Sequence, residues 1–186
     1  MRQPSFSRKH TMARVPLIDE SDSARAALIE QLKGARRGKL LNLYRVLLNS
    51  PSIAEAWQAF NSAIRFNTAL DAQARELAIL RVSQLNGADY QFQIHATQYA
   101  PEAGITPLQI AALGGSENAN LFLPSHRALL AYARAMTVAI DVPDAVFNKL
   151  RQHYNDAQIV ELTVLIGAYN MHTRVGRALR IDPESA

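Results

Sequence analysis

Apolar residues recur at helical spacing along almost the whole chain, and the strict alternation typical of a half-buried strand is nearly absent. In the segment Ser21–Arg37, for example, Leu28 and Leu32 lie along one side, and Ser21 or Ser23 is the predicted N-cap. Turn and capping residues bound the expected helices, which are Ser21–Arg37, Leu40–Leu48, Pro51–Phe66, Asp71–Leu85, Ala88–Pro101, Thr106–Leu113, Ser125–Met136, Asp141–His153 and Asn155–His172. The pattern predicts an all-α fold, a multihelical bundle of eight to ten helices with no sheet.

Two of these helices, on either side of Asn86-Gly87, carry the candidate chemistry. The first, Asp71–Leu85, is apolar nearly all round, as buried helices are, yet it includes the acid Glu76. Asn86-Gly87 tolerates the left-handed backbone conformation and ends this helix. At about 100° per residue, His95 shares a face of the next helix with Gln91, one turn earlier. The tight connection therefore places the helix that carries the acid next to the helix that carries the imidazole.

This acid and this imidazole permit two interpretations. A buried carboxylate is costly unless it is paired, so Glu76 has His95, Tyr90 or an arginine as possible partners. The pair is either an acid/base site or a structural hydrogen bond that holds the helical hairpin together. No two histidines have the i, i+4 spacing with nearby acids that zinc sites use, so no metal is expected.

Charge and composition narrow the class of protein. The net charge of +4 resides in the first 14 residues, because they hold four of the 20 bases and none of the 16 acids. A neutral body with a basic end is unlike a nucleic-acid-binding domain, so we expect no nucleic acid as partner. The sequence has no cysteine, which excludes disulfides and thiol catalysis.

The same sequence predicts the domain organisation and location. Residues 1–13 are expected to form a basic, flexible tail, or Met12 to be the true initiator, and 14–186 to form a single domain. The tail lacks the apolar core of a secretory signal, and no apolar run reaches about 18 residues. We therefore expect a cytoplasmic protein with no membrane partner.

The residues around the helical hairpin resemble the signature of the carboxymuconolactone decarboxylase and alkylhydroperoxidase D-like (AhpD-like) family. The matching positions are Glu76, Leu77, Leu80-Arg81-Val82-Ser83, Asn86-Gly87, Tyr90 and His95. The likeness continues upstream through Arg14-Val15-Pro16-Leu17 and downstream to Gly167-Ala168-Tyr169-Asn170, so it covers about residues 14–180. It implies an AhpD-like helical bundle and a homo-oligomer, a trimer or a hexamer.

The chain departs from the thiol-active branch of that family at two positions. In that branch a Cys-x-x-Cys follows the Asn-Gly, whereas Ala88 and Gln91 stand there in this sequence. The peroxiredoxin activity for which the family is best known requires a thiolate, so that mechanism is excluded.

The decarboxylase branch, which needs neither cysteine nor cofactor, implies a different chemistry. By this resemblance His95 is the proton donor or base and Glu76 orients it, while Tyr90, Gln91 and Arg81 bind the substrate. The expected reaction is a lyase or isomerase step on a small organic acid or lactone, with no cofactor. The alternative is a non-catalytic or ligand-binding homo-oligomer with the same fold.

Overall fold

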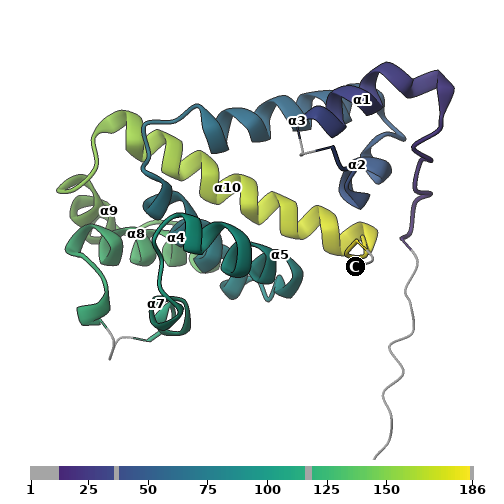
Figure 1. Ribbon diagram of the computed structural model, residues 1–186. Helices are drawn as coiled ribbons and strands as arrows, with labels where there is room; N and C mark the ends of the chain where they lie inside the picture. The colour runs from purple at the N-terminus through teal and green to yellow at the C-terminus, as the bar shows by residue number, and fades with distance from the viewer. Residues whose placement is uncertain (1–12, 36–37, 116–118, 185–186) are drawn as a thin grey trace, which may run out of the picture. The chain divides into compact units, whose positions relative to one another are not determined.

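The computed structural model of the protein describes residues 13–35, 38–115 and 119–184. The described residues form helices and contain no strand, which confirms the predicted all-α fold (Figure 1). The α-helices are α1 (Ala26–Gly34), α2 (Asn42–Leu47), α3 (Pro51–Phe66), α4 (Ala72–Leu85), α5 (Asp89–Ile94), α6 (Ala100–Glu102), α7 (Pro107–Ala112), α8 (Pro124–Arg134), α9 (Asp144–Arg151) and α10 (Asp156–Leu179). Short 3₁₀ turns lie at Ser23–Arg25 and Ala119–Leu121, and π-helical segments at His95–Tyr99 and Ala135–Ala139.

Local capping explains where several helices begin. Asp71 accepts a hydrogen bond from the backbone N–H of Ala74 at 2.8 Å and starts α4, as predicted. Thr106 and Gln109 form a reciprocal capping box at the start of α7. Asn155 and Gln158 bond each other's backbone N–H groups in the same way before α10.

Two predicted helix boundaries are wrong. The first helix is shorter than Ser21–Arg37, because Asp22 rather than a serine caps a 3₁₀ turn, accepting from the backbone N–H of Ala24, before α1 begins. The last helix does not end near His172 but continues to Leu179, where Arg180 adopts a positive φ of 51°. No proline interrupts the intervening residues, so nothing stops the helix earlier.

The described residues fall into two compact units, one within Met1–Ala59 and Val175–Ala186 and the other Phe60–Arg174. Nearly all of the predicted tail, 1–13, lies outside the described residues, and the single-domain organisation stays a prediction. In the described part of the chain, no helix is long and apolar enough to cross a membrane.

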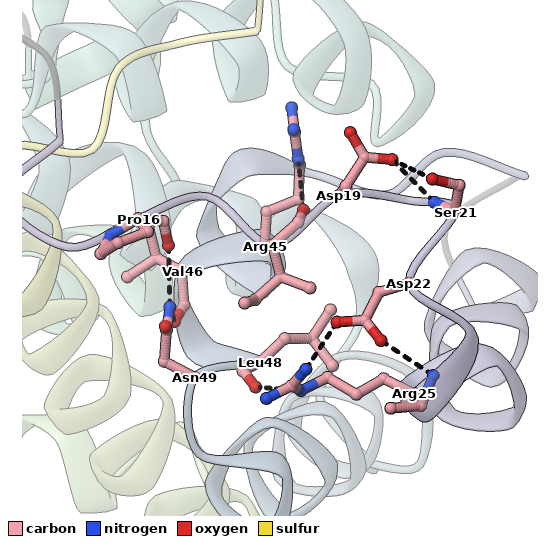
Figure 2. A network of polar contacts seen from close by, with 11 residues as sticks. Pro16, Asp19, Ser21, Asp22, Arg25, Arg45, Val46, Leu48 and Asn49 are labelled. Atoms are coloured by element: carbon pink, nitrogen blue, oxygen red, sulfur yellow. Dashed lines mark hydrogen bonds and ion pairs between the residues drawn. The ribbon is translucent and has the colours of Figure 1, made fainter.

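The first unit has its own apolar core and a polar network along its surface. The core contains Ile29, Leu32, Leu40, Tyr44, Leu47, Leu48, Ala54 and Trp57. In the network, Arg25 pairs with Asp22 and donates to the Leu48 carbonyl at 3.0 Å, and Asn49 donates to the Pro16 carbonyl at 2.8 Å (Figure 2). These bonds attach the segment before α1 to the end of α2.

The second unit is built around α4, which packs against α8. Nine of the fourteen residues of α4 are buried, including the polar or charged Glu76, Arg81 and Ser83. Such burial agrees with the apolar character of the helix, and it places Glu76 and Arg81 where their polar atoms need partners.

Candidate active site

The turn after α4 folds α5 back against it. Gly87 has a φ of 59°, in the left-handed region that glycine adopts without strain. The backbone N–H of Ala88 then donates to the Ser83 carbonyl at 2.8 Å, closing the helix end. This connection brings the predicted acid and histidine together.

His95 is the first residue of the π-helical segment that follows α5. A π turn widens the helix locally and often occurs at functional sites. The His95 side chain is only 5% exposed, whereas Gln91, one turn earlier, is half-buried and Tyr90 is 41% exposed. The helix therefore points His95, rather than its neighbours, into the interior.

Glu76 and His95 form a short, buried hydrogen bond. The His95 Nδ1 lies 2.6 Å from Glu76 Oε2, and Glu76 is 3% exposed. Burial lowers the pKa of His95 although the bond to Glu76 acts in the opposite direction, so the imidazole is neutral near pH 7. With Glu76 as the acceptor, the Nδ1 carries the proton and the Nε2 is the nitrogen whose lone pair can act as a base.

Tyr169, on α10, occupies the other side of the imidazole. Its hydroxyl lies 3.4 Å from His95 Nε2, which is long for a hydrogen bond. The two rings meet edge to face with centroids 5.5 Å apart, and Tyr99 packs against the same imidazole at 5.1 Å. Glu76, His95 and Tyr169 thus form a line of carboxylate, imidazole and phenol.

Arg65, at the end of α3, supplies a positive charge to this cluster. Its guanidinium carbon lies 4.6 Å from the centroid of the Tyr99 ring. Burial opposes the charged guanidinium, but nearby Tyr169, Tyr99 and Glu76 outweigh it and raise the pKa of this side chain. A second cation, Arg75, has its Nε 4.0 Å from Glu76 Oε1. Both positive charges lie near the Glu76 carboxyl group.

Of the predicted substrate-binding residues, Gln91 lies beside this cluster. Its Oε1 accepts a hydrogen bond from Thr173 Oγ1 at 3.4 Å, and Thr173 also bonds the backbone carbonyl of Tyr169. The Gln91 Nε2 is buried without a hydrogen-bond partner among the described residues. Tyr90 is largely solvent-exposed, and no described hydrogen bond connects it to Glu76 or His95.

The third predicted residue, Arg81, is not brought to the acid–histidine pair. Its Nη1 donates to Gln84 Oε1 at 2.6 Å, and no contact within the described residues joins it to Glu76 or His95. Arg81 lies five positions after Glu76 on α4, which places the two about 140° apart around the helix.

Sequence reasoning missed Tyr169 and Arg65 as members of the site. Tyr169 stood in the Gly167-Ala168-Tyr169-Asn170 match without an assigned role, and only the packing of α10 shows that it faces His95. Arg65 follows the apolar face of α3 and carries no local signal that distinguishes it from a surface arginine.

The arrangement suits proton transfer. A neutral imidazole held by a carboxylate can take a proton at Nε2, and the carboxylate then stabilises the imidazolium. In the described ranges, no group of three or more histidine, aspartate or glutamate side chains could hold a metal ion.

The fold and site define the chain as an AhpD-like helical protein with a buried acid–histidine pair. Residues 51–135 match the model of the carboxymuconolactone decarboxylase family. Over these residues the chain is similar to that family, and its sequence contains no cysteine.

Three individual proteins are also similar to the chain. YdfG of Bacillus subtilis (strain 168), described as uncharacterized, is 29% identical over 114 residues, which are 60% of this chain and 77% of YdfG. The crystal structure of ATU0492 from Agrobacterium tumefaciens, described as a protein of unknown function related to AhpD, superposes with a TM-score of 0.67 at 26% identity, covering 75% of this chain and 96% of that one. A peroxidase-related protein from Silicibacter sp. TM1040 has the same fold, with a TM-score of 0.78 at 19% identity over 97% of this chain and 96% of that one.

Proposed function

We propose that this protein is a cofactor-free lyase or isomerase that performs acid/base chemistry on a small organic acid or lactone. The observation that carries the proposal is the buried 2.6 Å hydrogen bond between Glu76 and His95, which leaves Nε2 as the basic nitrogen. The sequence has no cysteine, so peroxide reduction through a thiolate is not available to it.

In the proposed reaction, His95 Nε2 removes a proton from the carbon next to the substrate carbonyl. The C–H electron pair moves into an enolate, and Glu76 stabilises the imidazolium that forms. An isomerase returns this proton to a different carbon of the same substrate. In a decarboxylation the order differs: the C–C bond breaks, carbon dioxide leaves, and a protonated His95 donates its proton to the resulting carbanion. The Gln91 amide and the Arg65 charge support a developing negative charge on the substrate.

A second candidate function is a non-catalytic or ligand-binding homo-oligomer, in which the Glu76–His95 bond is structural. It is favoured by the close packing of the imidazole between two tyrosine rings and by its 5% exposure. For both functions, we propose a trimer or hexamer of identical chains and a cytoplasmic location.

Proton exchange separates the two functions. A panel of small lactones and carboxylic acids is incubated with the protein in D₂O, and deuterium incorporation and product formation are followed by NMR. The acid/base proposal expects His95→Gln and Glu76→Gln to lower turnover by a factor of about 10²–10⁴ while circular dichroism shows folded protein. His126→Gln is the matched control, because His126 is also 5% exposed but lies on α8.

Equal turnover in His95→Gln and wild type, or no exchange with any substrate of the panel, would favour the structural function. In that case the variant lowers only the free energy of unfolding, by about 1–3 kcal/mol for one buried hydrogen bond.

A further inference from the structure

Arg81 is a buried arginine whose hydrogen bonds are incomplete. The residue is 8% exposed, and its one described hydrogen bond joins Nη1 to Gln84 Oε1 at 2.6 Å. Its Nε is closed off from solvent and has no hydrogen-bond partner among the described residues. A guanidinium carries five N–H donors, and leaving charged donors unpaired in the interior is costly.

A second arginine, Arg134, adds to the free-energy cost of burying the charged Arg81. Arg134, the last residue of α8, is exposed and close enough for its charge to act on Arg81. Burial first, and then the charge of Arg134, lower the pKa of Arg81. The helices that carry the two arginines, α4 and α8, pack against each other, and no ion pair in the described ranges connects either arginine to a carboxylate.

The backbone at Gly114 lies beside the Arg81 guanidinium. Gly114, just after α7, lies against this side chain: an added Cβ there would stand 3.4 Å from Arg81 Nη1 and 3.5 Å from Gln84 Nε2. Gln84 meanwhile fixes one edge of the guanidinium. The fork of Arg81 is therefore held in one orientation, while Arg134 is reachable from solvent.

We propose that Arg81 and Arg134 bind a small carboxylate anion, with Gln84 orienting the Arg81 guanidinium. The two oxygens of a carboxylate match the spacing of guanidinium donors, and a negative charge between the two arginines replaces repulsion by attraction. The site lies on the far side of α4 from Glu76, and it does not rest on the acid/base function proposed above.

The test uses acetate as the probe on the full chain. Side-chain Nε–H signals of ¹⁵N-labelled arginines are followed by NMR while sodium acetate replaces sodium chloride at constant ionic strength. The Arg81 signal is expected to move saturably, and Arg134→Gln is expected to weaken acetate affinity about tenfold or more, as for the loss of one charge-assisted hydrogen bond. Since Arg134 is exposed, this variant tests the site without disturbing the core.

Two further variants sharpen the result. Arg81→Lys keeps the charge but loses the fork, so it is expected to bind acetate more weakly than wild type. Arg151→Gln is the matched control, because it removes one exposed arginine that pairs with Asp156 on the surface; acetate affinity should not change. Equal acetate affinity in wild type and Arg134→Gln would overturn the proposal.

A second source of the carboxylate, another copy of the chain, is distinguished by measuring the assembly state. Light scattering after gel filtration compares the mass of wild type and Arg134→Gln. A lower mass for the variant would show that a carboxylate of a second copy occupies the site, and would also overturn the proposal.

Discussion

At the scale of single residues, His95 is held as a neutral imidazole with one committed and one basic nitrogen. Its Nδ1 is committed to Glu76, so only Nε2 can change its protonation state while the bond persists. The charged and titratable groups around it come from four elements: Arg65 from α3, Arg75 and Glu76 from α4, Tyr99 from the π segment, and Tyr169 and His172 from α10. The negative carboxylate favours the imidazolium, while burial and the cation of Arg65 oppose it.

This balance predicts how stability depends on pH. Because the pKa of His95 is lowered by folding, the unfolded chain binds more protons than the native state between the two pKa values. The free energy of unfolding therefore falls as the pH falls below the ordinary histidine pKa of about 6.5, by up to about 1.4 kcal/mol per pH unit. The free energy of unfolding, measured with urea between pH 7.5 and 5.5, should therefore fall more steeply with decreasing pH in wild type than in His95→Gln.

Arg65→Gln is the informative control for this prediction. It keeps the titrating imidazole but removes a positive charge that lowers its pKa, so the pH-dependent loss should be smaller than in wild type. Only the slopes are compared, since each variant also changes the stability at pH 7.5. Parallel slopes in wild type and His95→Gln would show that folding does not lower the pKa of His95.

Sequence reasoning found half of this cluster. Glu76 and His95 could be predicted because they lie on consecutive helices around a tight Asn86-Gly87 turn, where local spacing decides which faces meet. Tyr169 reaches the imidazole from α10, more than 70 positions later, and Arg65 comes from α3. Side chains that meet only through tertiary packing leave no periodic signal in the sequence, so their roles required the structure.

At the scale of elements, two π-helical segments interrupt the regular α-helical geometry. The first begins at His95, and the second, Ala135–Ala139, follows α8. Asn170 connects α10 to its surroundings: its amide donates to Thr137 Oγ1 at 3.1 Å, and its Oδ1 accepts from Asn86 Nδ2 at 3.0 Å. These bonds fix the turn of α10 that carries Tyr169. The apolar pattern continues unbroken through both π segments, so it could not predict them.

The residue that follows the second π segment, Ile140, is strained, and this predicts a stabilising substitution. Ile140 has φ 68° and ψ −55°, a conformation that a β-branched side chain disfavours, and it is 81% exposed. Ile140→Gly relieves strain of about 1–2 kcal/mol, loses little burial, and costs about 0.5–1 kcal/mol in backbone entropy.

The expected net effect of Ile140→Gly is an increase of up to about 1 kcal/mol in the free energy of unfolding, measured with urea. Val138→Gly is the matched comparison, since Val138 is also exposed and β-branched but has a negative φ, and it should destabilise the protein by about 1 kcal/mol. A loss of stability in both variants would contradict the assigned strain.

At the scale of the whole molecule, two helices belong to both compact units. The boundary between the units falls after Ala59, within α3, and after Arg174, within α10. Each unit has its own buried core, so burial alone would permit the two to unfold separately. Separate unfolding would have to interrupt two continuous helices, however, and the resulting helix ends would lose their backbone hydrogen bonds.

We therefore expect the protein to unfold as one cooperative unit, in line with the single domain predicted for residues 14–186. Trp57, the single tryptophan of the sequence, is buried in the core of the first unit, so its fluorescence reports on that unit alone. Far-ultraviolet circular dichroism reports on helices of both units. Coincident urea midpoints from the two measurements are the expected result.

A pair of core variants provides a stricter test of coupled unfolding. Leu32→Ala in the first unit and Leu77→Ala in the second each remove a side chain that is 0% exposed, at a cost of about 3 kcal/mol. If the units are coupled, each variant lowers the midpoint of both signals by the same amount, although the cavity lies in only one core. If Leu32→Ala shifts the Trp57 fluorescence and leaves most of the circular dichroism transition in place, the units unfold independently. The Glu76–His95 site would then depend for its stability on the second unit alone, since all of its members lie within Phe60–Arg174.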